Sequence, residues 1–206
     1  MVEIVDIAGL VKGASKGEGL GNKFLANIRE THAIIHVLRC FDDENVTHVD
    51  GSIDPIRDKE TIDLELQLKD LETLQKKKDS LKRVAASGNK RAVQELDILD
   101  SYYKHILSGK SARSLNISND EVILDLNLLT KKPILYICNV NESGINGNKY
   151  TQIVQDYLAN ENADMLIISA EVEADINELD NIGDKEEFLK DFGLSEPGVN
   201  KIIKSA

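Results

Sequence analysis

The first thirty residues constrain the fold of this chain more than any other stretch. The short run 2–5 is rich in β-branched residues and ends at Asp6, and five glycines follow within the thirteen residues from Gly9 to Gly21. We interpret this pattern as a buried strand with a carboxylate at its C-terminal end, then a glycine-rich loop, then a helix over 22–30. In open α/β sheets, ligands bind just outside the carboxyl ends of the strands.

The residue types at this predicted sheet edge suit a metal ion and a phosphate group. A carboxylate such as Asp6 can hold a hydrated Mg²⁺. The amide of Gly9 can meet a phosphate oxygen because glycine has no side chain in the way. Asp-x-x-Gly by itself is a short pattern that occurs by chance in many chains. The extended string around it is too specific to occur by chance. The N-terminal stretch therefore predicts a binding edge.

The rest of the chain alternates between apolar runs and helical periodicity. The run 31–40 is almost continuously apolar, as is typical of buried strands in parallel sheets. A loop over 41–55 follows it. Further strands are predicted at 133–138 and 165–168, and further helices at 148–160, 174–179, 185–192 and 197–203.

The segment 58–108 differs in composition, with no proline, one glycine and many charges. Two sets of apolar residues recur at helical spacing on either side of a break at 87–89, and the second set follows the 4-3-4-3 rhythm of a coiled-coil seam. The first set is Leu64, Leu68, Leu71 and Leu74, and the second is Ala92, Leu96, Leu99, Tyr103 and Ile106. We expect an antiparallel helical hairpin, in which the two helices pack on each other.

Basic residues gather around the predicted tip of this hairpin. They are Lys76, Lys77, Lys78, Lys82, Arg83, Lys90 and Arg91. Such a run is typical of a solvated helix face, and binding of a polyanion such as RNA is the alternative. Both interpretations stay open on the sequence alone.

Composition excludes several classes of protein. The net charge of −11 argues against a general basic coat for nucleic acid. Two cysteines, Cys40 and Cys138, indicate free thiols in a reducing compartment. The sequence has no apolar run of about 18 residues, which a transmembrane helix needs. It also has no basic N-terminal region followed by an apolar stretch, as a signal peptide has. We therefore expect a cytoplasmic chain with no membrane partner.

Several strings resemble one family. DIAGLVKGASKGEGLGNKFLANIRE (Asp6 to Glu30) and HVLRCF (His36 to Phe41) are similar to the YchF/Obg-like ATPases, a branch of the P-loop GTPase superfamily. The resemblance continues through GSIDPIRD, ARSL, LLTKKPILYICNVNE and ISAEVEADINELD, and so covers nearly the whole chain. It implies an α/β P-loop NTPase (Ras-like) core with a mostly parallel sheet, interrupted by the inserted antiparallel helical hairpin.

The resemblance also implies a domain order. We expect residues 1–55 to form the first part of the NTPase core with its switch region, 56–128 the inserted helical domain, and 129–206 the second, base-binding part. No Gly-x-x-x-x-Gly-Lys-Ser/Thr occurs in these residues, although that phosphate loop precedes the matching segment in the family. We therefore expect a core incomplete at its N-terminus, without the family's C-terminal domain. We expect this chain alone neither to bind nucleotide tightly nor to hydrolyse it.

Two short boxes are expected to surround the nucleotide base. GTPases carry Asn-Lys-x-Asp after the corresponding strand, and its carboxylate accepts two hydrogen bonds from guanine. Here the box reads Asn139-Val140-Asn141-Glu142, like the pattern of the ATP-preferring YchF branch, and Ser169-Ala170 matches the second box. Without the family match, an Asn-rich turn after a strand would be the simpler interpretation.

The resemblance assigns catalytic roles near the glycine-rich loop. Gly9 would sense the γ-phosphate through its amide, and Asp6 would hold Mg²⁺ through water. Leu10 stands where many GTPases place the glutamine that orients the attacking water. Leucine cannot polarise water, so another group must do so, and His48 is the candidate because histidine is the side chain that ordinarily titrates near neutral pH. A solvated loop histidine is the alternative.

The expected function follows from these assignments. The resemblance implies a regulatory ATPase associated with ribosomes and stress responses, which binds ATP with Mg²⁺ and GTP more weakly. The loop 11–21 would reorder on hydrolysis. Two alternatives remain: a fragment acting as a helical-hairpin interaction module, and a GTPase of the Obg type. If the strands ending at Cys40 and Cys138 are neighbours, their thiols could sense oxidants near the nucleotide; buried inert thiols are the other interpretation.

Overall fold

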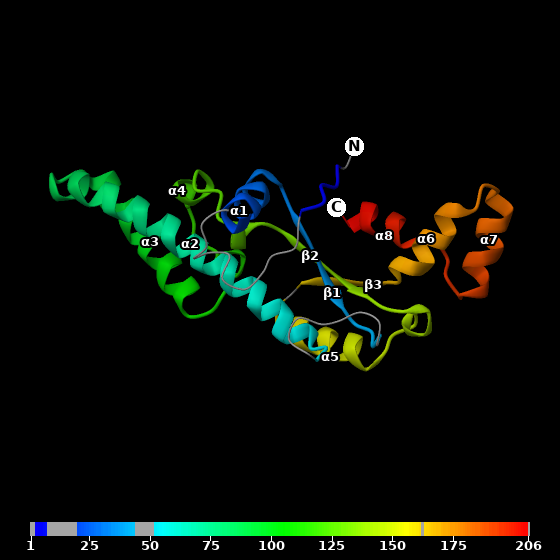
Figure 1. Cartoon of the computed structure of the whole chain (residues 1–206). Helices are drawn as coiled ribbons and strands as arrows, with labels where there is room; N and C mark the ends of the chain where they lie inside the picture. Colours follow the sequence, from blue (N-terminus) through cyan, green and yellow to red (C-terminus); the bar gives the residue numbers. More distant parts are fainter. Residues whose placement is uncertain (1–2, 8–19, 44–51, 162, 206) are drawn as a thin grey trace. The chain divides into compact units, whose positions relative to one another are not determined.

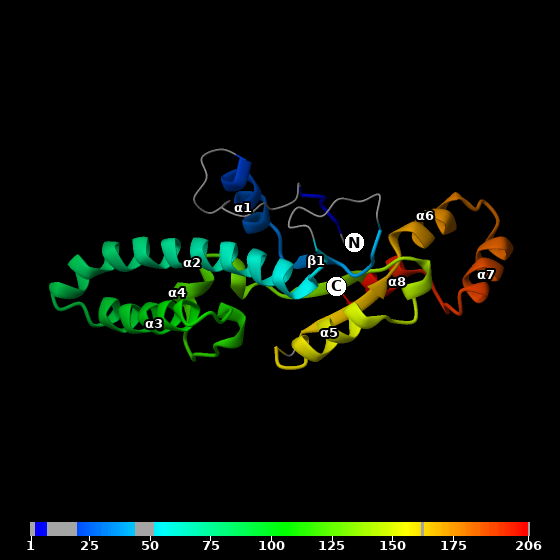
Figure 2. The same ribbon diagram turned by 60° about the horizontal axis from the view of Figure 1, so that its bottom comes forward.

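The computed structural model describes residues 3–7, 20–43, 52–161 and 163–205. Figure 1 shows its elements in chain order, and Figure 2 shows them from a second direction. The helices are α1 Leu20–Glu30, α2 Pro55–Ala86, α3 Lys90–Leu107, α4 Glu121–Leu124, α5 Lys149–Leu158, α6 Ala170–Glu178, α7 Ile182–Asp191 and α8 Gly198–Ser205. The strands are β1 Ile34–Arg39, β2 Ile134–Asn139 and β3 Asp164–Ile168, and short 3-10 turns lie at Ala112–Ser114, Leu129–Lys131 and Glu142–Gly144.

The chain forms two compact units. The sheet unit comprises Met1–Ile4, Ile35–Lys59 and Ile134–Ala206, and the helical unit comprises Val5–Ile34 and Glu60–Pro133. In the described part of the chain, no helix is both long enough and apolar enough to cross a membrane.

The described residues of the sheet unit form three strands in the order β1-β2-β3. β2 and β3 are parallel, with Leu135 opposite Asp164 and Asn139 opposite Ile168. The connection between them is α5, which packs against β3 (Figure 1). Parallel strands need such a crossover because a tight turn cannot return the chain to the same end of the sheet. The α/β fold expected from the sequence is confirmed.

The core of the sheet unit combines the strands with α5. Its buried members are Leu38, Cys40, Tyr136, Cys138, Val140, Val154 and Leu158. The residues from α5, Val154 and Leu158, are four positions apart and so lie on one face of the helix. A second cluster joins Val172 and Ile176 of α6 to Leu189 of α7.

The helical unit contains the hairpin that the sequence predicts. α2 and α3 lie side by side in both views and run antiparallel, since Lys78 pairs with Asp100 at 2.5 Å and Gln67 bonds to the carbonyl of Gly109 (Figures 1 and 2). The break falls at the expected place. Gly88 has φ +85°, a conformation that glycine adopts without steric cost, and Asn89 caps α3.

The seam of the hairpin is only partly as predicted. In α3 the expected Leu99 and Ile106 are fully buried. In α2 the expected Leu74 is buried in the same cluster as these two residues. The expected Leu64 is 54% exposed, and Leu66 is buried instead, so the prediction is wrong for Leu64. The reason is that Ile62 and Leu66, in the N-terminal half of α2, pack in a cluster with α1 rather than with α3.

Two predicted strands differ from the structure. Residues 3–7 have no regular secondary structure, and Ile4 and Val5 are 56% and 57% exposed, so the prediction of a buried strand at 2–5 is wrong for its described residues. A strand needs a partner for its backbone groups, and none pairs with this segment among the described residues. β1 is shorter than the predicted 31–40. It buries Leu38 but leaves Val37 57% exposed, because it lies at the edge of the described sheet.

Candidate functional site

The carboxyl ends of the three strands meet at one edge of the sheet unit. Two main-chain hydrogen bonds continue the ladder just beyond the strand ends: Cys40 N donates to Asn139 O at 2.8 Å, and Val140 N donates to Ile168 O at 3.0 Å. Because the ladder is continuous, the loops that follow the three strands begin at neighbouring positions along the same edge of the sheet. This is the edge at which open α/β proteins bind ligands.

The side chain of Asn139 joins the two predicted base boxes. Its Oδ1 accepts a hydrogen bond from Ala170 N at 3.0 Å. Ser169 precedes α6 as its N-cap, and its Oγ accepts from Val172 N at 3.4 Å. The sequence predicted that these residues would gather at one site, and the structure brings Asn139, Ser169 and Ala170 together. The N-terminus of α6, with its partial positive charge, therefore lies at this edge.

The loop after β2 takes a compact shape. Val140 is 2% exposed and packs in the core, whereas Glu142 is exposed and begins the turn Glu142–Gly144. A Cβ on Gly144 would lie 2.9 Å from Asn148 Nδ2 and 3.0 Å from Val140 Cβ, so only glycine fits there without displacement. The carboxylate of Glu142 is thus presented to solvent at the start of a tightly packed turn.

Asn148 is a site residue that the sequence analysis missed. Its Nδ2 donates to Cys40 O at 2.7 Å, and its Oδ1 accepts from Tyr150 N and Thr151 N. Asn148 and Thr151 form a capping box at the start of α5. The signal available in the sequence was an Asn three positions before a Thr at the start of a helical pattern. Asn148 fastens α5 to the end of β1.

Asp42 anchors the loop that follows β1. Its carboxylate accepts a hydrogen bond from Tyr150 Oη at 2.6 Å and lies 3.3 Å from Lys149 Nζ. The Tyr150 hydroxyl, aided by the Lys149 ammonium, holds the pKa of Asp42 below its ordinary value. α5 therefore holds both the backbone and a side chain of the segment Cys40–Asp42.

The two cysteines are neighbours at this edge. Cys40 and Cys138 are both fully buried and both free. The hydrogen bond between the thiols, together with burial, raises the pKa of Cys40. The same hydrogen bond lowers the pKa of Cys138. Burial keeps reagents away from both thiols, whichever of the two is the more acidic. The geometry therefore favours the inert interpretation of this pair.

An open groove of about 860 Å³ borders the first base box. Its lining includes Glu142 and Ile145, Glu171 of α6, Phe188 of α7 and Phe192, which caps the end of α7. Its volume lies within the range of small-molecule pockets. Acidic residues and no basic ones are among the described residues that line the groove, so an anionic phosphate does not suit it, and a base or a cationic group does.

The remaining predicted site residues lie elsewhere. Asp6 belongs to the helical unit, and its side chain is exposed. Gly9, Leu10 and His48 lie outside the described residues, as does most of the loop 11–21. Among the described residues, no three His, Cys, Asp or Glu side chains form a cluster that could hold a metal. Mg²⁺ at phosphate sites takes one or two carboxylates with phosphates and waters, so an exposed Asp6 is a fitting donor.

The parallel strands, the crossover helix and the position of the two boxes at the strand ends are those of the α/β fold of P-loop NTPases. Comparisons with known proteins agree. Residues 1–140 match the family described as 50S ribosome-binding GTPase. The chain is 44% identical over 209 residues to the ribosome-binding ATPase YchF of Bacillus subtilis and 46% identical over 206 residues to that of Haemophilus influenzae, each alignment covering 99% of the chain.

A solved structure is also similar. The YchF GTPase of Schizosaccharomyces pombe superposes with a TM-score of 0.82 at 31% identity, over 95% of this chain and 54% of that one. The chain belongs to the 50S ribosome-binding GTPase family. It spans about half the length of the curated relatives, 57% of the first and 56% of the second.

Proposed function

We propose that the protein containing this chain is a regulatory ATPase of the YchF type, which binds and hydrolyses ATP and acts on the ribosome. The observation that carries this proposal is the hydrogen bond between Asn139 Oδ1 and Ala170 N, which joins the two base boxes at the binding edge. The curated relatives are named ribosome-binding ATPases, which supports ATP as the nucleotide and the ribosome as the partner. The similar solved structure is named a GTPase, so it supports hydrolysis of a nucleoside triphosphate without favouring ATP.

The base site is assigned to Asn139, Val140, Glu142, Ser169 and Ala170. Since Asn139 Oδ1 is engaged by Ala170, its amide nitrogen is the group left to donate to an acceptor nitrogen of a purine. The side chain of Val140 is buried, so its part is to hold the loop against β3. Glu142 replaces the shorter aspartate that reads the two donors of guanine, and adenine offers no such pair. This supports a preference for ATP over GTP.

Binding of the phosphates and of the metal ion is assigned to the N-terminal stretch. Asp6 would hold Mg²⁺ through water, and the ion would neutralise developing charge on the phosphates. Gly9 would contact the γ-phosphate through its amide, and His48 would position the attacking water in place of Leu10. The loop 11–21 would be the switch that changes on hydrolysis. The motif from Asp6 to Glu30 supports these assignments.

We further propose the domain order 1–55, 56–128 and 129–206, in which the helical hairpin is an insertion in the nucleotide-binding core. The ribosome is the proposed partner, and the cytoplasm the proposed compartment, because the family is defined by ribosome binding. Contact with RNA would use the hairpin tip.

The charges of the tip limit that contact. Lys76, Lys78, Lys82 and Arg91 each pair with an acidic residue of the hairpin. For Lys77, Arg83 and Lys90 no ion pair is found in the described part of the chain, and these three are the residues proposed to meet phosphates.

Two other functions compete with this proposal. A helical-hairpin interaction module would need no nucleotide, and a GTPase of the Obg type would prefer GTP. Calorimetric titration of the whole protein with Mg²⁺–ATP and with Mg²⁺–GTP separates the three. Tighter binding of ATP supports the proposal, tighter binding of GTP favours the Obg type, and no binding of either leaves the interaction module.

The site itself is tested by Asn139→Ala. This change removes a proposed contact with the base and also the hydrogen bond that holds Ala170 N. We expect the affinity for ATP to fall by about tenfold or more, which is the effect of losing one or two hydrogen bonds. Asn146→Ala is the matched control, because Asn146 is an exposed Asn in the same loop. Equal ATP affinity for both variants would refute the assignment.

A further inference from the structure

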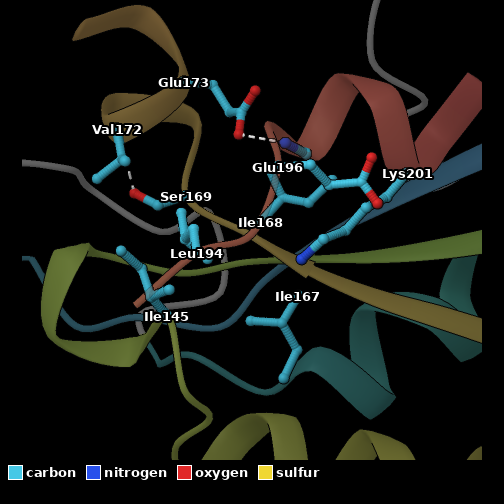
Figure 3. A pocket seen from close by; sticks show the side chains of 10 residues that line it. Ile145, Ile167, Ile168, Ser169, Val172, Glu173, Leu194, Glu196 and Lys201 are labelled. Carbon is cyan, nitrogen blue, oxygen red and sulfur yellow. Dashed lines mark hydrogen bonds between the residues drawn. The ribbon is translucent and has the colours of Figure 1, made fainter. Parts of the chain in front are cut away.

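The start of α8 is fastened to α6 by one carboxylate. Glu173 Oε1 accepts a hydrogen bond from Gly198 N at 2.5 Å, and Oε2 accepts from Val199 N at 3.3 Å. Figure 3 shows the Glu173 carboxylate directed at the N-terminal end of α8. An anionic acceptor at the N-terminus of a helix is favourable, because it meets orphan N–H groups and the positive end of the helix dipole.

Glu173 lies one turn after the second base box. Its own backbone N donates to Ser169 O at 3.0 Å, within the first turn of α6. In the same turn Ser169 Oγ accepts from Val172 N, and Ala170 N donates to Asn139. Glu173, whose carboxylate binds the start of α8, therefore belongs to the same helical turn as the second base box.

The contact is close and leaves no room for a ligand. A Cβ on Gly198 would lie 2.9 Å from Glu173 Oε1 and 3.0 Å from Ile168 Cγ2. The enclosed space beside it, lined also by Ile145 and Lys201, measures only about 10 Å³ (Figure 3). This is room for at most one water, so the arrangement is a structural clamp. α8 in turn packs on β3, whose last residue is Ile168.

We propose that Glu173 is a positioning residue of the nucleotide base site. Its carboxylate clamps the first turn of α6 to the start of α8 and so fixes Ser169 and Ala170 relative to Asn139. This inference rests on the proposed function, since the base site is the one assigned there. Glu173 itself does not contact the nucleotide, and its effect reaches the base through the position of the turn.

The test uses two variants that loosen the clamp by different means. Glu173→Gln keeps the shape of the side chain but turns one acceptor into a donor that faces a backbone N–H. Gly198→Ala pushes the same contact apart from the α8 side. Glu178→Gln is the matched control, because it makes the same chemical change at an exposed position of the same helix.

The first measurement is amide hydrogen exchange without nucleotide. We expect both clamp variants to exchange about two- to tenfold faster at Ala170–Glu173 as well as at Gly198 and Val199, the range that loss of one hydrogen bond gives. The control should match the unmodified chain. Faster exchange confined to α8, with α6 unchanged, would overturn the proposal, since Glu173 would then be only a cap of α8.

The second measurement is an NMR titration with Mg²⁺–ATP, followed at the Ala170 amide, which also detects weak binding. We expect the dissociation constant to rise about two- to tenfold in both clamp variants and not in the control. In the whole protein the same changes should raise KM for ATP and leave kcat unchanged. An unchanged dissociation constant in both variants would overturn the positioning role. If ATP leaves Ala170 unperturbed in the unmodified protein, the base-site assignment fails, while the exchange experiment still decides the coupling of α8 to α6.

Discussion

The buried carboxylate of Asp70 gives the sharpest test of the helical unit. Asp70 lies on α2 and is fully buried. Its Oδ1 accepts from Leu129 N at 2.8 Å, and its Oδ2 accepts from Thr130 N and Thr130 Oγ1, both at 2.7 Å. One side chain thus satisfies the donors of the 3-10 turn that leads into β2.

Replacement of Asp70 by alanine should be costly. It leaves two buried backbone N–H groups and one hydroxyl without their acceptor, at about 1–3 kcal/mol each. Removal of a buried charge offsets part of this loss. We therefore expect Asp70→Ala to lower the free energy of unfolding by about 3 kcal/mol, within the range found when one partner of a buried polar network is deleted.

Urea denaturation followed by circular dichroism measures this loss. Asp79→Asn serves as the control, because Asp79 is an exposed aspartate of the same helix, and it should leave the midpoint unchanged. A loss below about 1 kcal/mol for Asp70→Ala would refute the reasoning, since that is less than the cost of one orphaned donor.

The pH dependence of Asp70 tests the balance between burial and hydrogen bonding. Burial raises the pKa of Asp70 above its ordinary value, although the bonds from Thr130 and Leu129 oppose this. Because this pKa is raised in the folded state, the contribution of Asp70 to the free energy of unfolding is complete below the unfolded pKa of about 4. It is lost as the pH rises through the folded pKa. The stability of the unmodified chain relative to Asp70→Asn should therefore decline over that window. A relative gain with rising pH would show that hydrogen bonding dominates.

Three further predictions concern other buried or constrained residues. Lys59 is 1% exposed and pairs with Glu161 at 2.8 Å. In urea denaturation, Lys59→Ala should lower the free energy of unfolding by about 2–4 kcal/mol, whereas the volume-conserving Lys59→Met should lower it much less. Gly88→Ala should lower the free energy of unfolding by about 1 kcal/mol, because a residue with a Cβ is strained at the φ of +85° even though the space around it is open. An unchanged denaturation midpoint would contradict this. Cys40 and Cys138 should react with a thiol reagent only at the rate of unfolding, since both side chains are fully buried; fast labelling at pH 8 would contradict this.

The sequence predicted regular elements well where local pattern decides them. The helix at 22–30, the break at 87–89 and the strand at 133–138 fall close to their observed places. The strand at 2–5 failed because a strand is stable only when another segment supplies hydrogen bonds, and no local pattern records that partner. The predicted burial of Leu64 was wrong for a similar reason, because the helix against which this part of α2 packs, α1, lies far away in the sequence.

For the candidate site, family resemblance identified the boxes, and tertiary structure showed how they are held. Asn139, Ser169 and Ala170 were predicted, and their meeting follows from the register of β2 and β3. Asn148 and Glu173 were not predicted as site residues, because they act on partners that no local motif connects to them.

The sequence by itself determined the class of fold, the helical hairpin and the chemistry of the strand ends, because periodicity, glycine placement and short motifs act within a few residues. Only the tertiary structure decided which buried polar groups satisfy one another. Asp70 and Leu129 are 59 positions apart, and Asn148 and Cys40 are 108 apart. A buried donor must find its acceptor wherever packing places it, and at such separations that choice is made by the whole core rather than by neighbouring residues.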